Sequence, residues 1–344
     1  NAIKLTLNIC LKQLGINKYV DYKLSNEDVN NPKPNPEIYL RIFLHFGIYP
    51  SEAIIFEDSH YGREAAVSSG AQLYPVKNIS DLNLKNVKMV LNEKKVKFKK
   101  NISWEDNKMN VLIPMAGAGK RFFDAGYIFP KPLIEVDNKP MIQWVIESLN
   151  LNANYIFIIQ KEHQKKYNIS SVLRILKPNC KIIELDHITE GAACTTLLAK
   201  KFINNSNPLI IANSDQYIRW NSSKAIYNFN SKNLDGAILT FEAIHPKWSY
   251  AKCDKDGFVL EVAEKKVISK NATVGVYYWK HGSDYVKSAE EMIKKNIRVN
   301  NEFYVCPVYN EFISKKKKVK IHNVEEMWGL GTPEDLNNFI QKFK

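Results

Sequence analysis

The densest group of residues that could do chemistry lies in residues 114–133, which read PMAGAGKRFFDAGYIFPKPL. Gly117 and Gly119 remove side chains from a loop, so that backbone N–H groups can approach phosphate oxygens. Arg121 and Lys131 add fixed positive charge at the same place. A bare GxG also occurs in ordinary tight turns, but GxGxR followed by PKPL at this spacing predicts a nucleotide site.

A single carboxylate, Asp215, follows an apolar run in IIANSDQ. A doubly wound sheet places ligand-binding carboxylates at the ends of such strands. One carboxylate together with substrate phosphates is a usual way to hold Mg²⁺. An aspartate in a plain turn is the alternative, and the strand-end position favours a Mg²⁺ ligand.

The elements around these residues alternate between strand and helix. Strands are expected at 111–114, 155–159, 181–185 and 208–212, and a helix at 141–149. Such alternation indicates an α/β fold with a mostly parallel sheet. Further on, Asp256-Gly257 predicts a hairpin turn, and 273–279 another strand. The last helix should begin after Thr332 as N-cap, with Pro333 at N1 and Asp335 at N3.

A second acidic group lies in residues 1–92, which form a smaller α/β segment. A helix is expected at 36–46, ending before Gly47, and a short strand at 54–56 with Glu57 and Asp58 at its carboxyl end. Residues 93–108 are dense in lysine without apolar periodicity, which predicts a linker. The second domain is therefore expected to span 109–344.

Composition narrows the class of protein. The 344 residues suit two domains, with 45% hydrophobic and 25% charged residues. No apolar run approaches the roughly 18 residues of a membrane span, and no signal peptide is evident, so membrane insertion is not expected. Five scattered cysteines without a CxxC pair fit reduced thiols, and we expect a cytoplasmic protein. The chain begins at Asn1 in what reads as the middle of a domain, so we expect the natural N-terminus to lie upstream.

The net charge of +13 raises the question of a polyanionic partner. The excess is spread over lysines, with short runs at 94–100 and 315–318. Neither run carries the interleaved aromatic residues of a base-stacking surface. Solvated surface lysine is the favoured interpretation, and no nucleic-acid partner is expected.

Residues 109–344 resemble the sugar-1-phosphate nucleotidyltransferase family, on the strength of the glycine loop, PKPL and the strand-end aspartate. The resemblance implies a Rossmann-like mixed, mostly parallel sheet and transfer of a nucleoside monophosphate from an NTP to a phosphorylated small molecule, with release of pyrophosphate. It implies that Lys131 contacts the triphosphate where the α-phosphate reacts, and that Asp215 binds the Mg²⁺ cofactor. The triphosphate would be held by Gly117, Ala118, Gly119 and Arg121, and the base by the loop Glu190-Gly191-Ala192.

The same resemblance implies an acceptor site. Glu264 would bind acceptor hydroxyl groups and Lys265 its phosphate, and Gly275 and Tyr277, in ATVGVYYW, are candidates for lining the pocket. A solvated pair at 264–265 and a core role for Tyr277 are the alternatives. One departure is clear: many relatives have an aspartate two residues before the final GT, and here that position is Gly329. The second protein ligand of the metal is therefore not identified.

Residues 32–71 resemble the haloacid dehalogenase (HAD) superfamily, in particular its β-phosphoglucomutase-like phosphatases and mutases. Lys33 matches the lysine that steadies the phosphorylated nucleophile, and Glu57 and Asp58 match its acidic Mg²⁺-binding pair. The superfamily's catalytic DxD loop lies upstream of Asn1, so this partial domain is not expected to carry out HAD chemistry. In an intact polypeptide it would prepare the acceptor that the second domain activates.

Three functional hypotheses follow. The leading one is a nucleotidyltransferase that acts on a sugar 1-phosphate or similar metabolite for surface polysaccharide or nucleotide-sugar synthesis. A cytidylyltransferase for a non-sugar phosphate is the rival, because PMAGAGKRF and NSDQ look most like a branch found with capsule genes. From another class, the protein would be a HAD phosphatase or mutase with a regulatory nucleotide-binding domain. Homo-oligomer formation is left open.

Overall fold

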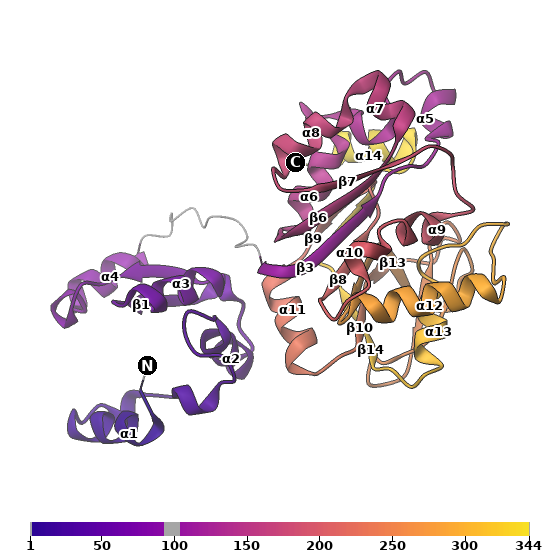
Figure 1. Cartoon of the computed structure of the whole chain (residues 1–344). Helices are drawn as coiled ribbons and strands as arrows, with labels where there is room; N and C mark the ends of the chain where they lie inside the picture. Colours follow the sequence, from indigo (N-terminus) through magenta and orange to yellow (C-terminus); the bar gives the residue numbers. More distant parts are fainter. Residues whose placement is uncertain (1, 93–103, 344) are drawn as a thin grey trace. The chain divides into compact units, whose positions relative to one another are not determined.

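The computed structural model describes residues 2–92 and 104–343, which form two compact units (Figure 1). The first unit contains residues up to Trp104 together with Asn221–Tyr227, and the second contains the rest of the chain. Of the expected linker, residues 93–103 lie outside the described residues. Residues 104–108 differ from the expectation, because strand β3 (Trp104–Pro114) already begins at Trp104.

The first unit is built on a two-stranded parallel sheet of β1 (Ile54–Glu57) and β2 (Gln72–Pro75). The expected helix at 36–46 is α2 (Glu37–Phe46), and Gly47 ends it in the left-handed conformation, with φ of 66°. The remaining elements are α1 (Lys4–Gln13), α3 (His60–Ser68) and α4 (Leu84–Asn92), with 3₁₀ turns at Asn17–Tyr19, Asn26–Asp28, Pro50–Glu52 and Ile79–Asp81.

A nine-stranded sheet organises the second unit, with strands in the order β12-β11-β13-β8-β3-β6-β7 and β10 and β14 attached through β13. β8 pairs with β3, and β6 with β7, in parallel, whereas β13 pairs antiparallel with both β8 and β10. The predicted mixed α/β fold with a parallel core is thereby confirmed. The strands are β6 (Leu151–Gln160), β7 (Lys181–Leu185), β8 (Leu209–Ala212), β10 (Gly236–Glu242), β11 (Tyr250–Cys253), β12 (Val259–Ala263), β13 (Asn271–Trp279) and β14 (Val319–Asn323).

Helices cover this sheet in separate groups. α9, α10, α12 and α13 pack together beside β12 and β13, and α7 and α8 pack near β6 and β7 (Figure 1). Small strand pairs complete the unit: β9 with β15, and β4 with β5. The bounds are α5 (Lys120–Asp124), α6 (Met141–Leu149), α7 (Lys161–Tyr167), α8 (Ile169–Leu176), α9 (Ala192–Leu197), α10 (Lys200–Ile203), α11 (Ser222–Ser231), α12 (Gly282–Lys294), α13 (Val308–Ile313), β4 (Glu135–Val136), β5 (Lys139–Pro140), β9 (Gln216–Arg219) and β15 (Glu326–Gly329).

The ends of the second unit follow the local sequence signals. The turn at Asp256-Gly257 joins β11 and β12, which pair antiparallel as expected. The last helix, α14 (Pro333–Lys342), begins where predicted, because the Thr332 side chain accepts a hydrogen bond from the Asp335 N–H. β13 ends inside the core, where Trp279 is fully buried and stacks on Tyr309 with ring centroids 4.2 Å apart. The β11–β12 hairpin, α14 and β13 therefore surround the strand ends that carry the candidate site.

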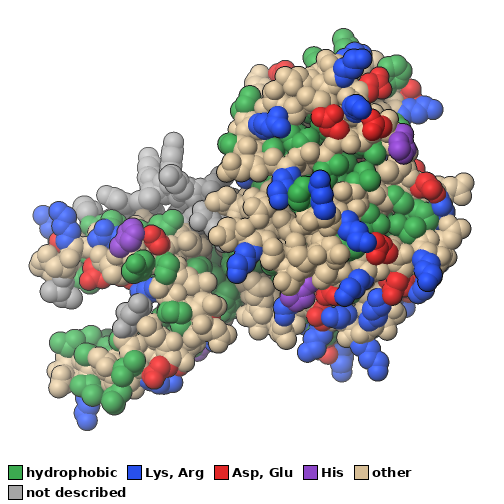
Figure 2. All heavy atoms as spheres, in the orientation of Figure 1, with side chains coloured by type: hydrophobic (Ala, Val, Ile, Leu, Met, Phe, Trp, Pro, Cys, Tyr) green, Lys and Arg blue, Asp and Glu red, His purple; other side chains and the backbone are tan. Residues whose placement is uncertain are grey.

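Lysine and acidic side chains are interspersed on the face of the second unit shown in Figure 2. In the run 315–318, Lys315 pairs with Glu291 at 2.6 Å, and Lys317 lies 3.6 Å from Asp235. The run at 94–100 lies outside the described residues. The five cysteines are free thiols. Among the described helices, none combines the length and the apolar character needed to cross a bilayer.

Candidate active site

The glycine loop, residues 115–119, leaves β3 at its carboxyl end and leads into α5. The side-chain amide of Gln160, the last residue of β6, donates hydrogen bonds to the carbonyl oxygens of Ala116 and Gly117 at 2.9 and 3.1 Å. A Cβ atom added at Gly117 would meet no atom within 4 Å. The fold itself therefore does not require glycine at 117, and the open space beside the loop can take a phosphate chain.

Lys131 and Asp215 face each other across the sheet edge. Lys131 begins the 3₁₀ turn Lys131–Leu133, and Asp215 follows β8. Lys131 Nζ lies 2.8 Å from Asp215 Oδ2, and each side chain keeps 24% of its surface exposed. The fold thus brings together two residues that are 84 positions apart in the sequence. Both groups can still reach a ligand because neither is sealed in the core.

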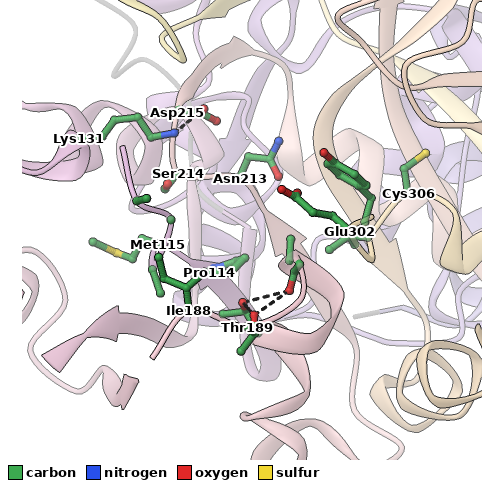
Figure 3. Close-up of a pocket in the computed structure, with 18 of the residues that line it drawn as sticks. Pro114, Met115, Lys131, Ile188, Thr189, Asn213, Ser214, Asp215, Glu302 and Cys306 are labelled. Atoms are coloured by element: carbon green, nitrogen blue, oxygen red, sulfur yellow. Dashed lines mark hydrogen bonds and ion pairs between the residues drawn. The ribbon is translucent and has the colours of Figure 1, made fainter. Parts of the chain in front are cut away.

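Two cavities meet at this ion pair. The first, about 470 Å³, lies beside the glycine loop and is lined by Ala118, Thr189, Ala192 and Asn213, among others (Figure 3). The second, about 540 Å³, contains Arg121, which is exposed and does not line the first cavity. Lys131 and Asp215 line both cavities, and so do Asn213, Ser249, Glu264 and Tyr277. The pair therefore stands at the passage between two ligand-sized spaces.

The expected base loop pairs with the backbone of a distant segment. Phe303 N–H donates to Glu190 O, and Ala193 N–H donates to Phe303 O, both at 2.9 Å. Gly191 has φ of 136°, and a Cβ atom there would lie 2.5 Å from the backbone of Phe303. Glycine is therefore needed at 191 for this close approach. The Glu190 carboxylate forms an ion pair with Arg298 and does not line either cavity.

The expected acceptor residues Glu264, Lys265 and Tyr277 line the second cavity. Ser249 Oγ donates a hydrogen bond to the Glu264 carboxylate, and burial raises the pKa of Glu264 above its ordinary value. Lys265 adopts φ of 53°, which is unusual for a residue with a side chain, and its Nζ lies 2.5 Å from Tyr304 Oη. Tyr277 is also a core residue, because only 4% of its surface is exposed.

Gly275 does not line either cavity, but it contacts Asn213, which does. Its φ is 75°, and a Cβ atom there would lie 2.2 Å from Asn213 Nδ2. Asn213 N–H donates to Gly275 O at 2.9 Å. The glycine thus makes room for Asn213, which lines both cavities.

Gly329 ends β15 and lies against an aromatic ring. A Cβ atom at 329 would lie 3.1 Å from Trp248 Cη2 and 3.7 Å from the Asp335 carboxylate. Among the described residues, no group of three or more His, Cys, Asp or Glu side chains is arranged to hold a metal ion. Asp215, half-open between the cavities, fits the kind of Mg²⁺ site in which one carboxylate acts together with substrate phosphates.

The first unit forms its own acidic site around Glu57. Lys33 Nζ and Tyr39 Oη each lie 2.6 Å from Glu57 Oε2, and Ser59 Oγ donates to Oε1 at 2.8 Å. Burial opposes ionisation of Glu57, but these hydrogen bonds outweigh it and lower its pKa to about 2. The structure thus places Lys33 beside Glu57, while Asp58 is exposed next to them.

Sequence reasoning missed Lys247, Trp248 and Ser249, which line the second cavity, and Asp335, which it placed only at a helix start. Lys247 Nζ lies 2.8 Å from Asp335 Oδ1. The available signal was the cluster HPKWSY directly before a predicted strand. Nothing in the spacing of these residues indicates that they meet Gly329 and Asp335, about 80 residues further on.

A glycine loop at the end of a parallel strand, facing a lysine–aspartate pair between two cavities, defines a nucleotide-binding α/β domain. Residues 110–342 match the family profile described as nucleotidyl transferase. The chain therefore belongs to the nucleotidyl transferase family, as predicted. Residues 1–76 match the profile described as haloacid dehalogenase-like hydrolase, which confirms the second resemblance.

Individual relatives agree with both assignments. The bifunctional protein GlmU of Thermosipho melanesiensis is 24% identical over 243 residues, which cover 69% of this chain and 51% of that protein. A phosphorylated carbohydrates phosphatase of Thermotoga maritima is 40% identical over 62 residues, which cover 18% of this chain and 29% of that protein. The chain spans about half the length of GlmU and less of the phosphatase.

Solved structures share the fold of the second unit. A nucleoside-diphosphate-sugar pyrophosphorylase of Vibrio cholerae RC9 aligns with a TM-score of 0.59 and 24% identity, covering 67% of this chain and 100% of that one. A UDP-glucose pyrophosphorylase solved with UDP-glucose aligns with a TM-score of 0.55 and 16% identity, covering 68% and 98%. At these identities the likeness shows the fold alone.

Proposed function

We propose that the second unit transfers a nucleoside monophosphate from an NTP to a phosphorylated small molecule and releases pyrophosphate. The observation that carries this proposal is the placement of Lys131 and Asp215 on the shared wall of two cavities. A transfer between two substrates requires two adjoining sites with the reacting atoms at their junction. The cavity beside the glycine loop would take the NTP, and the cavity lined by Lys265 and Trp248 would take the acceptor.

In the proposed reaction, an oxygen of the acceptor's phosphate forms a bond to the α-phosphorus of the NTP. The bond from that phosphorus to the oxygen bridging to the β-phosphate breaks, and pyrophosphate leaves with the bonding electrons. A phosphate monoester is already anionic near neutral pH, so no side chain needs to remove a proton. Lys131, Arg121 and the loop N–H groups would stabilise negative charge as it develops on the phosphates.

Asp215 is the residue proposed to hold Mg²⁺ together with the phosphates. When bound, this cation supplies further positive charge to the phosphate that is transferred. For this to occur, Lys131 must release the Asp215 carboxylate and turn to the NTP. The exposed quarter of each side chain gives both groups the freedom to do so.

We further propose that this reaction serves surface polysaccharide or nucleotide-sugar synthesis in the cytoplasm, with a sugar 1-phosphate or a similar phosphorylated metabolite as acceptor. The assignment follows the resemblance of residues 109–344 to sugar-1-phosphate nucleotidyltransferases, and the Vibrio cholerae pyrophosphorylase shares the fold of this unit. Cytidylyl transfer to a non-sugar phosphate is the rival form of the same chemistry. The base loop forms its hydrogen bonds to Phe303 through backbone groups, so its side chains do not indicate which NTP binds. The assay below identifies the NTP.

The test is pyrophosphate release with Mg²⁺, with CTP, dTTP, UTP, GTP and ATP each offered with sugar 1-phosphates and with non-sugar phosphomonoesters. We expect release with a defined NTP and acceptor, and a fall in kcat of about 100-fold or more in Asp215→Ala and Lys131→Ala. Lys200→Ala is the matched control, because Lys200 pairs with Glu290 and does not line either cavity.

Two results would contradict the proposal. One is an Asp215→Ala variant that keeps the wild-type rate. The other is tight NTP binding without pyrophosphate release for every acceptor, which would instead support a regulatory nucleotide-binding domain.

A further inference from the structure

The second cavity has an aromatic wall that the proposed chemistry does not use. Trp248 lines this cavity between Lys247 and Ser249, and part of its side chain is exposed. It lies in the connection between β10 and β11, outside the glycine loop and the strand ends that carry the reactive groups. A large, rigid indole at the edge of a ligand-sized cavity limits what the cavity can hold.

Gly329 and Trp248 fit each other closely. A Cβ atom at 329 would lie 3.1 Å from Trp248 Cη2, which is tighter than nine in ten real Cβ contacts. Gly329 is not in a left-handed conformation, so backbone strain does not explain the glycine. A Cβ atom at 329 would require the indole or its surroundings to shift by a few tenths of an ångström, so glycine at 329 favours the observed position of the indole.

Several contacts hold the indole where it is. The Trp248 ring packs edge-to-face on Phe241 with centroids 5.4 Å apart, and Lys247 Nζ lies 4.7 Å from its centroid. Lys247 in turn pairs with Asp335 at 2.8 Å, which ties this segment to α14. On the other side, Lys265 N–H donates to Trp248 O at 3.1 Å. The segment that carries Trp248 is therefore held by contacts to α14 and to Lys265, and both border the second cavity.

The cavity around this wall is suited to a phosphomonoester with a polar body. Arg121, Lys131, Lys247 and Lys265 supply positive charge for a phosphate, and Glu264 with Ser249 can bind hydroxyl groups. None of these groups distinguishes a short polyol from a larger sugar, because both carry hydroxyls and a phosphate. Trp248 is the largest side chain that lines this cavity, beside Tyr277 and Met327, and a large side chain in a cavity wall can make this distinction by shape.

We propose that Trp248, which packs against Gly329, is a specificity-determining residue that limits the size of the phosphomonoester that the second cavity accepts. This inference rests on the proposed transfer reaction and names a residue that determines its acceptor. Size selection by a pocket wall is typically worth about 10- to 200-fold per group excluded. The indole leaves the NTP cavity untouched, since it does not line that cavity.

The experiment compares kcat/KM for a graded series of acceptors, namely the phosphomonoesters of a three-carbon polyol, a five-carbon polyol and a hexose. We expect Trp248→Ala to shift the kcat/KM ratio toward the hexose phosphomonoester by about tenfold or more relative to wild type. The KM for the NTP should stay unchanged. Trp328→Phe is the control, because Trp328 lies in the neighbouring strand but does not line the cavity.

A double-mutant cycle tests the role of Gly329. Gly329→Ala should alter the acceptor ratio in the wild-type background and have no effect once Trp248 is alanine, because the glycine acts through the indole. An acceptor ratio within about twofold of wild type in Trp248→Ala overturns this inference and leaves the transfer reaction intact. Absence of pyrophosphate release by wild-type protein with every acceptor overturns both.

Discussion

At the scale of single residues, two carboxylates show how surroundings set acidity. The Glu57 carboxylate is buried but accepts hydrogen bonds from Lys33, Tyr39 and Ser59, so its pKa is lowered to about 2. Glu264 accepts one from Ser249, and burial raises its pKa. A group with a lowered pKa stabilises the folded state in its ionised form, whereas a group with a raised pKa is easier to bury in its neutral form.

We predict that Glu57→Gln lowers the free energy of unfolding of the first unit by about 2 kcal/mol at neutral pH. Because the folded pKa lies below the ordinary value of 4.5, this stabilisation is complete above that value and is lost as pH falls toward about 2. Urea unfolding followed by circular dichroism near pH 7 and near pH 3 measures the difference.

Glu64→Gln is the matched control in the same unit, since Glu64 pairs with His60 on the surface at 48% side-chain exposure. Its effect should stay within about 0.5 kcal/mol. A Glu57→Gln protein as stable as wild type at neutral pH would show that the hydrogen bonds do not stabilise the unit.

At the scale of elements, glycines in the site serve two different purposes. Gly191 is required by the protein itself, because Phe303 approaches to 2.5 Å from a would-be Cβ atom and φ is 136°. Gly117 has no protein atom within 4 Å of such a position. The first glycine therefore maintains the fold of the base loop, and the second leaves space for a ligand.

We predict opposite outcomes for alanine at the two positions. Gly191→Ala should destabilise the second unit by about 2–4 kcal/mol, since the clash is with backbone and the conformation is strained. Gly117→Ala should change stability by no more than about 0.5 kcal/mol and weaken NTP binding by about tenfold. Thermal unfolding and nucleotide titration separate the two effects, and a stability loss in Gly117→Ala equal to that in Gly191→Ala would refute the distinction.

The sequence predicted the elements of the sheet edge better than the contacts between them. The strand at 181–185 and the helix at 141–149 have the expected bounds, because each is short and has a clear apolar pattern. The pairing of Lys131 with Asp215 was not predicted, although both residues were expected in the site. The Trp248–Gly329 contact could not be predicted, because it joins segments about 80 residues apart that carry no complementary pattern. Glu190 was expected to bind the nucleotide, whereas its carboxylate forms an ion pair with Arg298.

At the scale of the whole molecule, the net charge of +13 is spread over lysines, many of which pair with acidic neighbours. The second cavity is lined by four basic side chains (Arg121, Lys131, Lys247 and Lys265) and three carboxylates (Asp215, Glu264 and Asp335), so positive charge is in slight excess there. Such a cavity attracts an anionic substrate, and mobile ions screen that attraction.

We predict that the KM of the acceptor rises on the order of threefold as salt increases from about 0.05 to 0.2 M. Lys265→Ala should flatten this dependence. Lys315→Ala, which removes a surface lysine paired with Glu291, should keep the wild-type slope. Initial rates across a salt series at fixed NTP concentration provide the measurement, and equal slopes in both variants would argue against a local electrostatic effect.

The ion pair between Lys131 and Asp215 also has a thermodynamic consequence for the order of events. Under the proposed chemistry, neither ligand can make its full set of contacts until this pair opens, so whichever ligand binds first bears the opening free energy. The second ligand then meets a site that is already open and binds more tightly than it would alone. Since linkage is reciprocal, the nucleotide and the acceptor would strengthen each other's binding by the same factor. While the Lys131–Asp215 ion pair is intact, the empty site would bind phosphate-containing molecules weakly. Once one ligand has bound and the pair is open, the site would bind the second ligand more tightly.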